Sequence, residues 1–290
     1  FYMGMQMPAV NNLLGTLGQT LALIGTFVVY ISGSHSLFYI SIVNTLAPLL
    51  VYVISYPITF GKRYPHLRPS IKLVDKKSIV ELFNMGMKFF VLQVSAVVLF
   101  MTTNILISRY YSPEMVTPYQ IAYRYFSVVQ LLFFIICVPY WSATTDAYNK
   151  QDFAWIKNAG KTLDRIIMGI MAIAVLMIVV SKPVYNIWIG DGDLVSSDLN
   201  VMVAIYVMLL TLSMRYSYIL NGFGTLRLQL IMTVSAAVCY IPLAMLFCKN
   251  SNDIRYLLAV MCAVNVPGLV VNTIQYYKII KGKAQGIWLK

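Results

Sequence analysis

Residues 120–140 read QIAYRYFSVVQLLFFIICVPY, an apolar run interrupted by polar side chains at regular spacing. The polar positions recur every three or four residues, which places them on one face of a helix, while Val, Leu, Phe and Ile cover the rest. A membrane helix whose polar stripe includes a cation is typical of a wet cavity or a buried contact. We therefore predict a cavity-facing membrane helix, whose stripe consists of Gln120, Tyr123, Arg124, Ser127 and Gln130.

The composition of the whole chain indicates several more helices of this kind. Of the 290 residues, 59% are hydrophobic and 11% are charged, and the mean hydropathy is +0.74. A soluble domain carries about 25% charged residues, and a transmembrane barrel has alternating segments of about 10 residues. The apolar runs here are about 20 residues long, as a membrane-spanning helix requires. The sequence therefore predicts an all-α polytopic membrane protein.

Eight apolar runs are long enough to span a membrane. We expect them at 11–32, 37–60, 80–108, 117–141, 163–181, 199–220, 227–247 and 255–279. The segment 141–165 has an amphipathic pattern, which predicts a segment that lies in the membrane interface before the fifth span. The segment 61–79 is the most basic loop and is long enough to link two halves of the protein.

The 22 Lys and Arg residues are distributed unequally between the two sides of the predicted spans. If both chain ends lie on one side, that side carries 16 of them, the other side carries 4, and Lys88 and Arg124 lie within spans. The positive-inside rule then places both ends of this chain in the cytoplasm. Because these residues flank spans, the net charge of +12 does not indicate a nucleic-acid partner. The chain begins FYMGMQMP without an initiator Met, so we expect it to be the later part of a longer protein.

Arg124 is the strongest candidate for ligand binding, and it has two interpretations. Near the outer end of its span it can extend to the interface, or it can hold a phosphate group through paired hydrogen bonds. The polar stripe beside it favours the second interpretation. Lys88 is either an interface anchor or a cation on the cytoplasmic side of the same cavity. Gln93 and Asn104 lie three turns apart on one face of their span, so they are further cavity candidates.

Other polar residues in the spans favour structural interpretations. The last span carries amide and small residues on one face, at Asn265, Gly268, Asn272 and Gln275. This pattern is typical of hydrogen bonding and close packing between membrane helices. Arg215 and Asn221 lie near the cytoplasmic end of the sixth span, where we interpret them as residues that set the topology.

Several classes of protein are disfavoured by the residues that carry chemistry. The spans contain no acid near their centres, whereas proton- or sodium-coupled exporters usually need one. The sequence has no phosphate-binding loop motif and no metal-type spacing of its four cysteines. The two histidines, His35 and His66, lie in loops, and the Asp191–Asp193 pair fits a solvated turn. We therefore expect a non-enzyme, with no catalytic residue, metal or cofactor, and a glycosyltransferase is disfavoured because its outer loops would have to be longer.

Four loose motifs and the C-terminal tail resemble a known family. The motifs are N-I-L-I-S at 104–108, V-x-x-Y-x-I-A-Y-R at 116–124, P-Y-W-S-A-T-T-D-A-Y at 139–148 and D-F-x-W-I-K at 152–157, and the tail is QYYKIIKGKAQGIW at 275–288. Together they resemble the C-terminal half of bacterial polysaccharide flippases. These proteins belong to the multidrug/oligosaccharidyl-lipid/polysaccharide exporter superfamily.

The resemblance implies a protein of twelve or more spans, arranged as two six-helix lobes around a central cavity. Residues 1–60 would then be the last two helices of the N-terminal lobe. Residues 61–79 would be the cytoplasmic linker, and residues 80–290 would be the complete six-helix C-terminal lobe. This placement agrees with the orientation that the Lys and Arg count predicts independently.

The function that the resemblance implies is the flipping of an undecaprenyl-pyrophosphate-linked oligosaccharide across the bacterial inner membrane by alternating access, for surface polysaccharide such as lipopolysaccharide. The expected partners are this lipid-linked substrate, the lipid bilayer and a polysaccharide polymerase or other assembly proteins. Arg124 and Lys88 would hold the pyrophosphate, and the other cavity residues would bind sugar hydroxyls. The predicted cavity set is Arg124, Gln120, Tyr123, Ser127, Gln130, Gln93, Asn104 and Lys88. A cation-coupled multidrug or small-molecule exporter of the same superfamily is the alternative.

Overall fold

A computed structural model of the chain describes residues 2, 5, 7–33, 36–70, 75–249 and 253–289. His35, Lys72 and Lys290, which the sequence analysis places in loops and in the tail, lie outside these residues. Every regular element among the described residues is helical. The α-helices are α1 (Pro8–Ile31), α2 (Leu37–Pro57), α3 (Lys76–Tyr110), α4 (Val116–Asn149), α5 (Phe153–Val179), α6 (Ser181–Ile189), α7 (Ser197–Gly222), α8 (Arg227–Cys248) and α9 (Ile254–Ile280).

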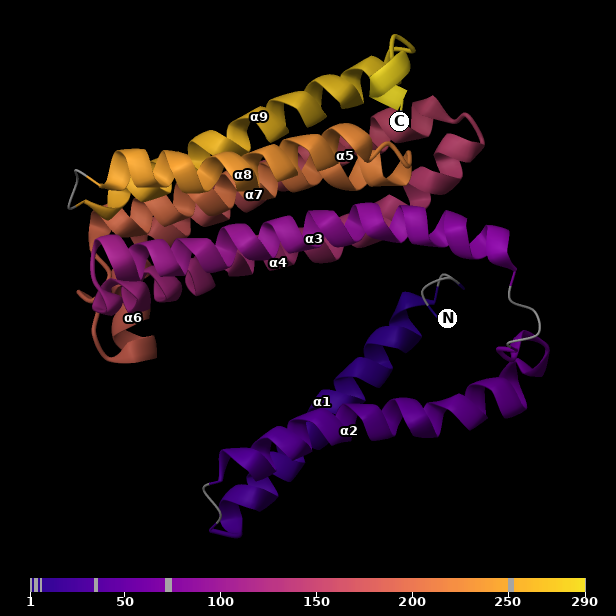
Figure 1. The fold of residues 1–290 in the computed structure, drawn as a ribbon, viewed down its shortest axis with the longest axis horizontal. Coiled ribbons are helices and arrows are strands. Elements are labelled where there is room, and N and C mark those ends of the chain that lie inside the picture. The colour runs from indigo at the N-terminus through magenta and orange to yellow at the C-terminus, as the bar shows by residue number, and fades with distance from the viewer. Residues whose placement is uncertain are drawn as a thin grey trace. The chain divides into compact units, whose positions relative to one another are not determined.

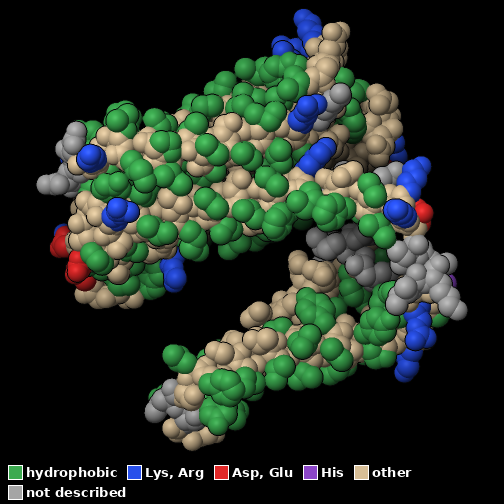
Figure 2. Space-filling model, in the orientation of Figure 1, with side chains coloured by type: hydrophobic (Ala, Val, Ile, Leu, Met, Phe, Trp, Pro, Cys, Tyr) green, Lys and Arg blue, Asp and Glu red, His purple; other side chains and the backbone are tan. Residues whose placement is uncertain are grey.

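Eight helical segments of the described chain are long and apolar enough to cross a membrane. The prediction of an all-α protein with eight spans is therefore confirmed. Large aliphatic side chains such as Leu131, Ile135 and Val238 are more than half exposed along these helices, as expected for a lipid-facing surface. Figure 2 shows hydrophobic side chains along the lengths of the helices and Lys and Arg side chains toward their ends. The chain is a multi-pass membrane protein.

The chain divides into two compact units, Phe1–Ile79 and Val80–Lys290. Unit 1 is a hairpin of α1 and α2 that packs through small residues. A Cβ added at Gly18 would lie 2.8 Å from the Cα of Pro48, so the two helices approach too closely there for a larger residue. A π-helical turn, Ile58–Arg63, and a 3-10 turn, Pro65–Leu67, follow α2.

Unit 2 is built around α7, which packs against α4, α5 and α9, while α8 packs against α9. The α4–α5 turn and the C-terminal end of α9 lie at one end of this unit, and the α3–α4 turn and α6 lie at the other (Figure 1). Two clusters of buried residues fill its interior, one around Tyr119, Phe126 and Leu257, the other around Phe133 and Leu163. Nearly every helix of the unit contributes one apolar face to these clusters.

Two predicted boundaries are wrong. The segment 141–165 is not a separate interfacial segment, because α4 continues to Asn149 and α5 already begins at Phe153. Asp152 is the N-cap residue of α5. Its side chain accepts a hydrogen bond from the Trp155 backbone N–H at 2.9 Å, which stabilises the start of the helix. The stretch 182–198, between the fifth and sixth predicted spans, likewise contains most of a short helix, α6 (Ser181–Ile189). The first error arises because α4 continues beyond the apolar run that crosses the membrane, and the second because hydropathy does not reveal a separate helix as short as α6.

Candidate functional site

Unit 2 contains a large cavity of about 810 Å³. It lies between α3, α4, α7, α8 and α9, and each of the described residues that line it is uncharged. Its polar and aromatic lining residues are Phe89, Phe90, Gln93, Phe100, Tyr123, Gln130, Trp141, Tyr206, Ser213, Ser217, Tyr218, Asn221, Gln229, Thr233 and Asn265. The site therefore offers amides, hydroxyls and aromatic ring faces to a ligand. The charge of a charged ligand would have to be balanced by groups outside this lining.

The helix α7 contributes the longest polar face to this large cavity. Tyr206, Ser213, Ser217 and Asn221 lie at intervals of seven, four and four residues, so a helix places them on one side. The helix α8 adds Gln229 and Thr233, one turn apart, and α9 adds Asn265. The oxygen atoms Asn221 Oδ1 and Gln229 Oε1 are buried and have no hydrogen-bond partner among the described residues. Such acceptors are available to a ligand that donates hydrogen bonds.

Aromatic rings line both ends of the large cavity. The Trp141 ring lies 5.5 Å from the ring of Phe89 and 5.8 Å from that of Tyr218. Toward the other end of α3, the Phe100 ring lies 5.2 Å from that of Tyr123. Phe89 and Phe100 are eleven residues apart, so the lining extends about 16 Å along α3 at about 1.5 Å per residue. An elongated ligand of several rings would fit this length.

The structure brings only part of the predicted cavity set to this site. Gln93, Tyr123 and Gln130 line the large cavity. Gln120 instead donates a hydrogen bond from Nε2 to Asn104 Oδ1 at 2.6 Å, which ties α4 to α3. The remaining residues lie outside the lining.

Ser127 and the two predicted cations are among the residues outside the lining. Ser127 Oγ donates to the Arg124 carbonyl at 2.8 Å, so its hydroxyl is bonded to the backbone of its own helix, α4. Arg124 and Lys88 are both exposed in unit 2. The predicted stripe of α4 therefore separates into a cavity-facing part, Tyr123 and Gln130, and a part that faces elsewhere.

Solved structures share this arrangement of helices. A MATE protein in the bent conformation matches with a TM-score of 0.78 at 16% identity, over 93% of this chain and 61% of that one. An outward-facing multidrug resistance MATE family transporter of the MOP superfamily matches with 0.77 at 15% identity, over 94% and 63%. The chain has the MATE transporter fold.

The likeness to MATE structures lies in the fold, because the sequences are far apart. A third MOP superfamily transporter, from Pyrococcus furiosus and described by the reverse polarity of its binding pocket, gives a TM-score of 0.76 at 14% identity, over 94% and 63%. The chain spans less than two thirds of the length of each of these three structures. No protein-family model and no curated protein matches the sequence.

Within this MATE fold, unit 2 contains an ion pair that the sequence does not predict. Arg215 on α7 is 2% exposed, and its Nε and Nη2 atoms donate to the two carboxylate oxygens of Asp164 on α5 at 2.7 and 2.9 Å. The guanidinium lies 4.2 Å from the ring centroid of Tyr216 and 4.4 Å from that of Tyr276. The interpretation of Arg215 as a topology residue is wrong, since it joins α5, α7 and α9 inside the unit.

Asn221, for which its position near the end of the span predicts a topology role, also faces inward and lines the large cavity. The missed signal for Asn221 was the spacing of the polar residues on α7. No comparable signal exists for Arg215 and Asp164, which are far apart in the sequence. Their pairing depends on how α5 and α7 pack.

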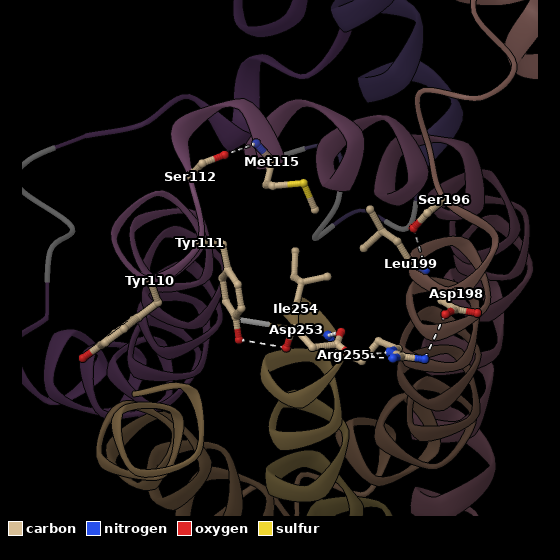
Figure 3. Close-up of a pocket in the computed structure, with 10 residues that line it drawn as sticks. All are labelled: Tyr110, Tyr111, Ser112, Met115, Ser196, Asp198, Leu199, Asp253, Ile254 and Arg255. Carbon is tan, nitrogen blue, oxygen red and sulfur yellow. Dashed lines mark hydrogen bonds and ion pairs between the residues drawn. The ribbon is translucent and has the colours of Figure 1, made fainter. Parts of the chain in front are cut away.

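A second pocket, of about 410 Å³, lies at the end of unit 2 where α4, α7 and α9 begin (Figure 3). Arg255 pairs there with Asp198 at 2.8 Å and with Asp253, so it joins the starts of α7 and α9. The hydrogen bond from Arg255 lowers the pKa of Asp253. The Tyr111 hydroxyl donates to the Asp253 carbonyl at 3.1 Å. These contacts form a clamp between helix ends.

Proposed function

We propose that this chain forms part of a transporter that flips a lipid-linked oligosaccharide across the bacterial inner membrane. The MATE fold supports transport by alternating access, in which two groups of helices rock around one site. We further propose that unit 2 is the complete C-terminal lobe and unit 1 the last part of the preceding lobe. The imbalance of Lys and Arg supports placing the α4–α5 turn on the cytoplasmic side.

One observation carries the choice of substrate: the large cavity is lined by amides, hydroxyls and aromatic rings. An amide group both donates and accepts hydrogen bonds, so Gln93, Gln130, Asn221, Gln229 and Asn265 can pair with sugar hydroxyls, which also do both. Aromatic rings provide flat apolar faces against which the C–H face of a sugar ring packs. The cavity is thus suited to a neutral saccharide.

The size of the large cavity fits the same substrate class. Its volume of about 810 Å³ is near the upper end of the range for small-molecule sites, about 300–1,000 Å³. A saccharide of a few units could occupy its length of about 16 Å. The polyprenyl tail would stay among the lipids, against the exposed aliphatic flank of the helices.

A cation-coupled multidrug exporter is the second candidate, because one matching structure is titled as a multidrug resistance transporter. Aromatic rings such as Trp141 can bind an organic cation. Of the lining amides, Asn221 and Gln229 have buried oxygen atoms without a hydrogen-bond partner among the described residues. An organic cation that lacks hydrogen-bond donors would leave these two oxygens unpaired, at a cost of about 1–3 kcal/mol each. We therefore favour the saccharide.

Substitution of Trp141 in the full-length protein tests this proposal. Trp141→Ala removes the central ring of one cavity wall, and Trp155→Ala is the matched control because Trp155 is 37% exposed at the start of α5. We expect Trp141→Ala to lower surface polysaccharide several-fold at equal protein level, while Trp155→Ala leaves it unchanged. Normal polysaccharide in Trp141→Ala, together with lost resistance to cationic drugs, would favour the exporter instead.

A further inference from the structure

The second pocket, where α4, α7 and α9 begin, offers both apolar and polar surface to a ligand. Met115, Leu199 and Ile254 form its apolar part. They lie between the ring of Tyr111 and the carboxylate of Asp198 (Figure 3). The pocket volume of about 410 Å³ falls within the range of small-molecule sites, about 300–1,000 Å³. The pocket is therefore large enough to hold a small ligand and not only solvent.

The charged groups of the second pocket balance one another. Arg255 pairs with Asp198 at 2.8 Å and with Asp253. Asp198 lies in the first turn of α7 and Asp253 is the N-cap residue of α9, positions at which the helix dipole stabilises negative charge. One guanidinium and two helix starts thus offset two carboxylates. The lining therefore favours a neutral polar ligand over an anion or a cation.

The same groups keep hydrogen-bonding capacity for such a ligand. A guanidinium has five N–H donors, and the contacts of Arg255 with the two carboxylates engage one N–H each of Nε, Nη1 and Nη2. Donors therefore remain on both Nη atoms. Asp198 accepts from Arg255 through Oδ2, which leaves Oδ1 as an acceptor. Ser196 Oγ accepts from the Leu199 backbone N–H at 3.4 Å, so its own proton can be donated to a ligand.

We propose that the second pocket binds a short neutral saccharide. A sugar hydroxyl both donates and accepts hydrogen bonds, so it matches the mixture of donors on Arg255 and acceptors on Asp198. The rings of Tyr110 and Tyr111 line the same pocket and provide flat apolar faces for the C–H face of a sugar ring. The pocket thus combines the two kinds of surface that a sugar presents.

The position of the second pocket gives this site a place in transport, and this step rests on the proposed function. In the proposed orientation, the starts of α4, α7 and α9 face the outside of the cell. Tyr110 ends α3 and is ten residues from Phe100, which lines the large cavity. The two sites are therefore about 15 Å apart along α3, at about 1.5 Å per residue. A saccharide of several units could reach from one site to the other, and the second pocket would hold its distal sugars as the substrate leaves.

The experiment measures binding of a soluble saccharide by the purified full-length protein in lipid nanodiscs. The probe is the host's own repeat oligosaccharide, released from its pyrophosphate lipid by mild acid, and binding is followed by saturation-transfer NMR. We expect saturable binding that Tyr110→Ala weakens at least fivefold. Tyr256→Ala is the matched control and should bind as the wild type does, because Tyr256 is 52% exposed near the start of α9 and lies outside the lining.

Chemical blocking of the pocket keeps the experiment decisive if Tyr110→Ala fails to fold. Ser196→Cys is labelled with a bulky, membrane-impermeant maleimide in a background whose other exposed cysteines are replaced by Ser. Ser197→Cys is the labelled control, because Ser197 is exposed beside Ser196 but lies outside the lining. We expect the label at residue 196 to abolish saccharide binding and the label at residue 197 to preserve it.

Two results would overturn the proposal. One is the absence of saccharide binding by the wild-type protein. The other is binding that survives both Tyr110→Ala and the label at residue 196 but is lost in Trp141→Ala, which would assign the saccharide to the large cavity alone. Flipping of the intact lipid-linked substrate by the same preparation is measured separately, so a failure of this site is distinguishable from a failure of the proposed function.

Discussion

Replacing Asp164 with alanine should strongly destabilise unit 2, because it leaves the guanidinium of Arg215 buried without its carboxylate. Arg215 is 2% exposed, and both of its bonds to Asp164, at 2.7 and 2.9 Å, would be lost. The carbonyl of Gly160, at 3.3 Å from Nη2, would still accept a hydrogen bond from the guanidinium but carries no full charge. Two tyrosine rings would remain against the guanidinium but cannot replace a carboxylate.

The magnitude follows from the burial of the two partners. Breaking a fully buried ion pair by removing one partner costs about 3–5 kcal/mol. The Asp164 side chain is 45% exposed, so water already screens part of the interaction. We therefore expect a loss of about 2–3 kcal/mol, which is about 30- to 150-fold in the unfolding equilibrium at about 1.36 kcal/mol per factor of ten.

The assay uses the buried thiols Cys137 and Cys248 as reporters of thermal unfolding in a Cys239→Ser background, since Cys239 is exposed. Asp146→Ala is the matched control, because its i,i+4 pair with Lys150 is 60–69% exposed and such pairs contribute about 0.3–0.5 kcal/mol. Replacing Asp164 and Arg215 together, by Leu and Met, should recover much of the loss. Equal destabilisation in Asp164→Ala and Asp146→Ala would refute this reasoning.

Three more predictions address other parts of the structure. Gly160→Ala should destabilise unit 2 by about 1–3 kcal/mol in the same thiol assay, because its Cβ would collide with the Tyr276 hydroxyl, whereas Gly169→Ala adds a Cβ to open space and should not. Arg124 is exposed and lies outside the cavity lining, so Arg124→Ala should leave surface polysaccharide unchanged at equal protein level; a several-fold loss, with partial recovery in Arg124→Lys, would contradict this and favour a role in holding the pyrophosphate. Arg255 lowers the pKa of Asp253, so the clamp should keep its full contribution above about pH 4 and lose it as the pH falls through that lowered pKa; hydrogen exchange at the start of α9 that rises already between pH 8 and 6 would contradict this.

Hydropathy predicts the eight spans well because the membrane demands a long apolar run whatever the neighbouring helices are. It predicts helix ends poorly, because α4 continues through the polar stretch after Trp141 until Asp152 starts the next helix. The lipid boundary and the helix boundary are separate features of the chain. Only the first of them appears in a hydropathy pattern.

The candidate site was predictable only in part. The stripe on α4 correctly identified a helix with a cavity-facing side, yet Gln120 pairs with Asn104, and Arg124 lies outside the cavity lining. Spacing indicates a common face but does not indicate the direction in which that face points. The spacing of Ser213, Ser217 and Asn221 on α7 was equally regular, and it could have been interpreted in the same way. The depth of Arg215 could not be inferred, since it follows from the packing of α5 and α9 around it.

The most direct test of the central claim is a translocation measurement with the full-length protein in proteoliposomes. A fluorescent undecaprenyl-pyrophosphate oligosaccharide is placed in both leaflets, and an impermeant quencher is added outside. Continued loss of fluorescence then reports movement of the labelled lipid from the inner to the outer leaflet. We predict that the wild-type protein exchanges the lipid between leaflets and that Trp141→Ala combined with Gln130→Ala slows this exchange at least tenfold. Exchange no faster than in empty liposomes, with export of a cationic dye by the same preparation, would contradict the account.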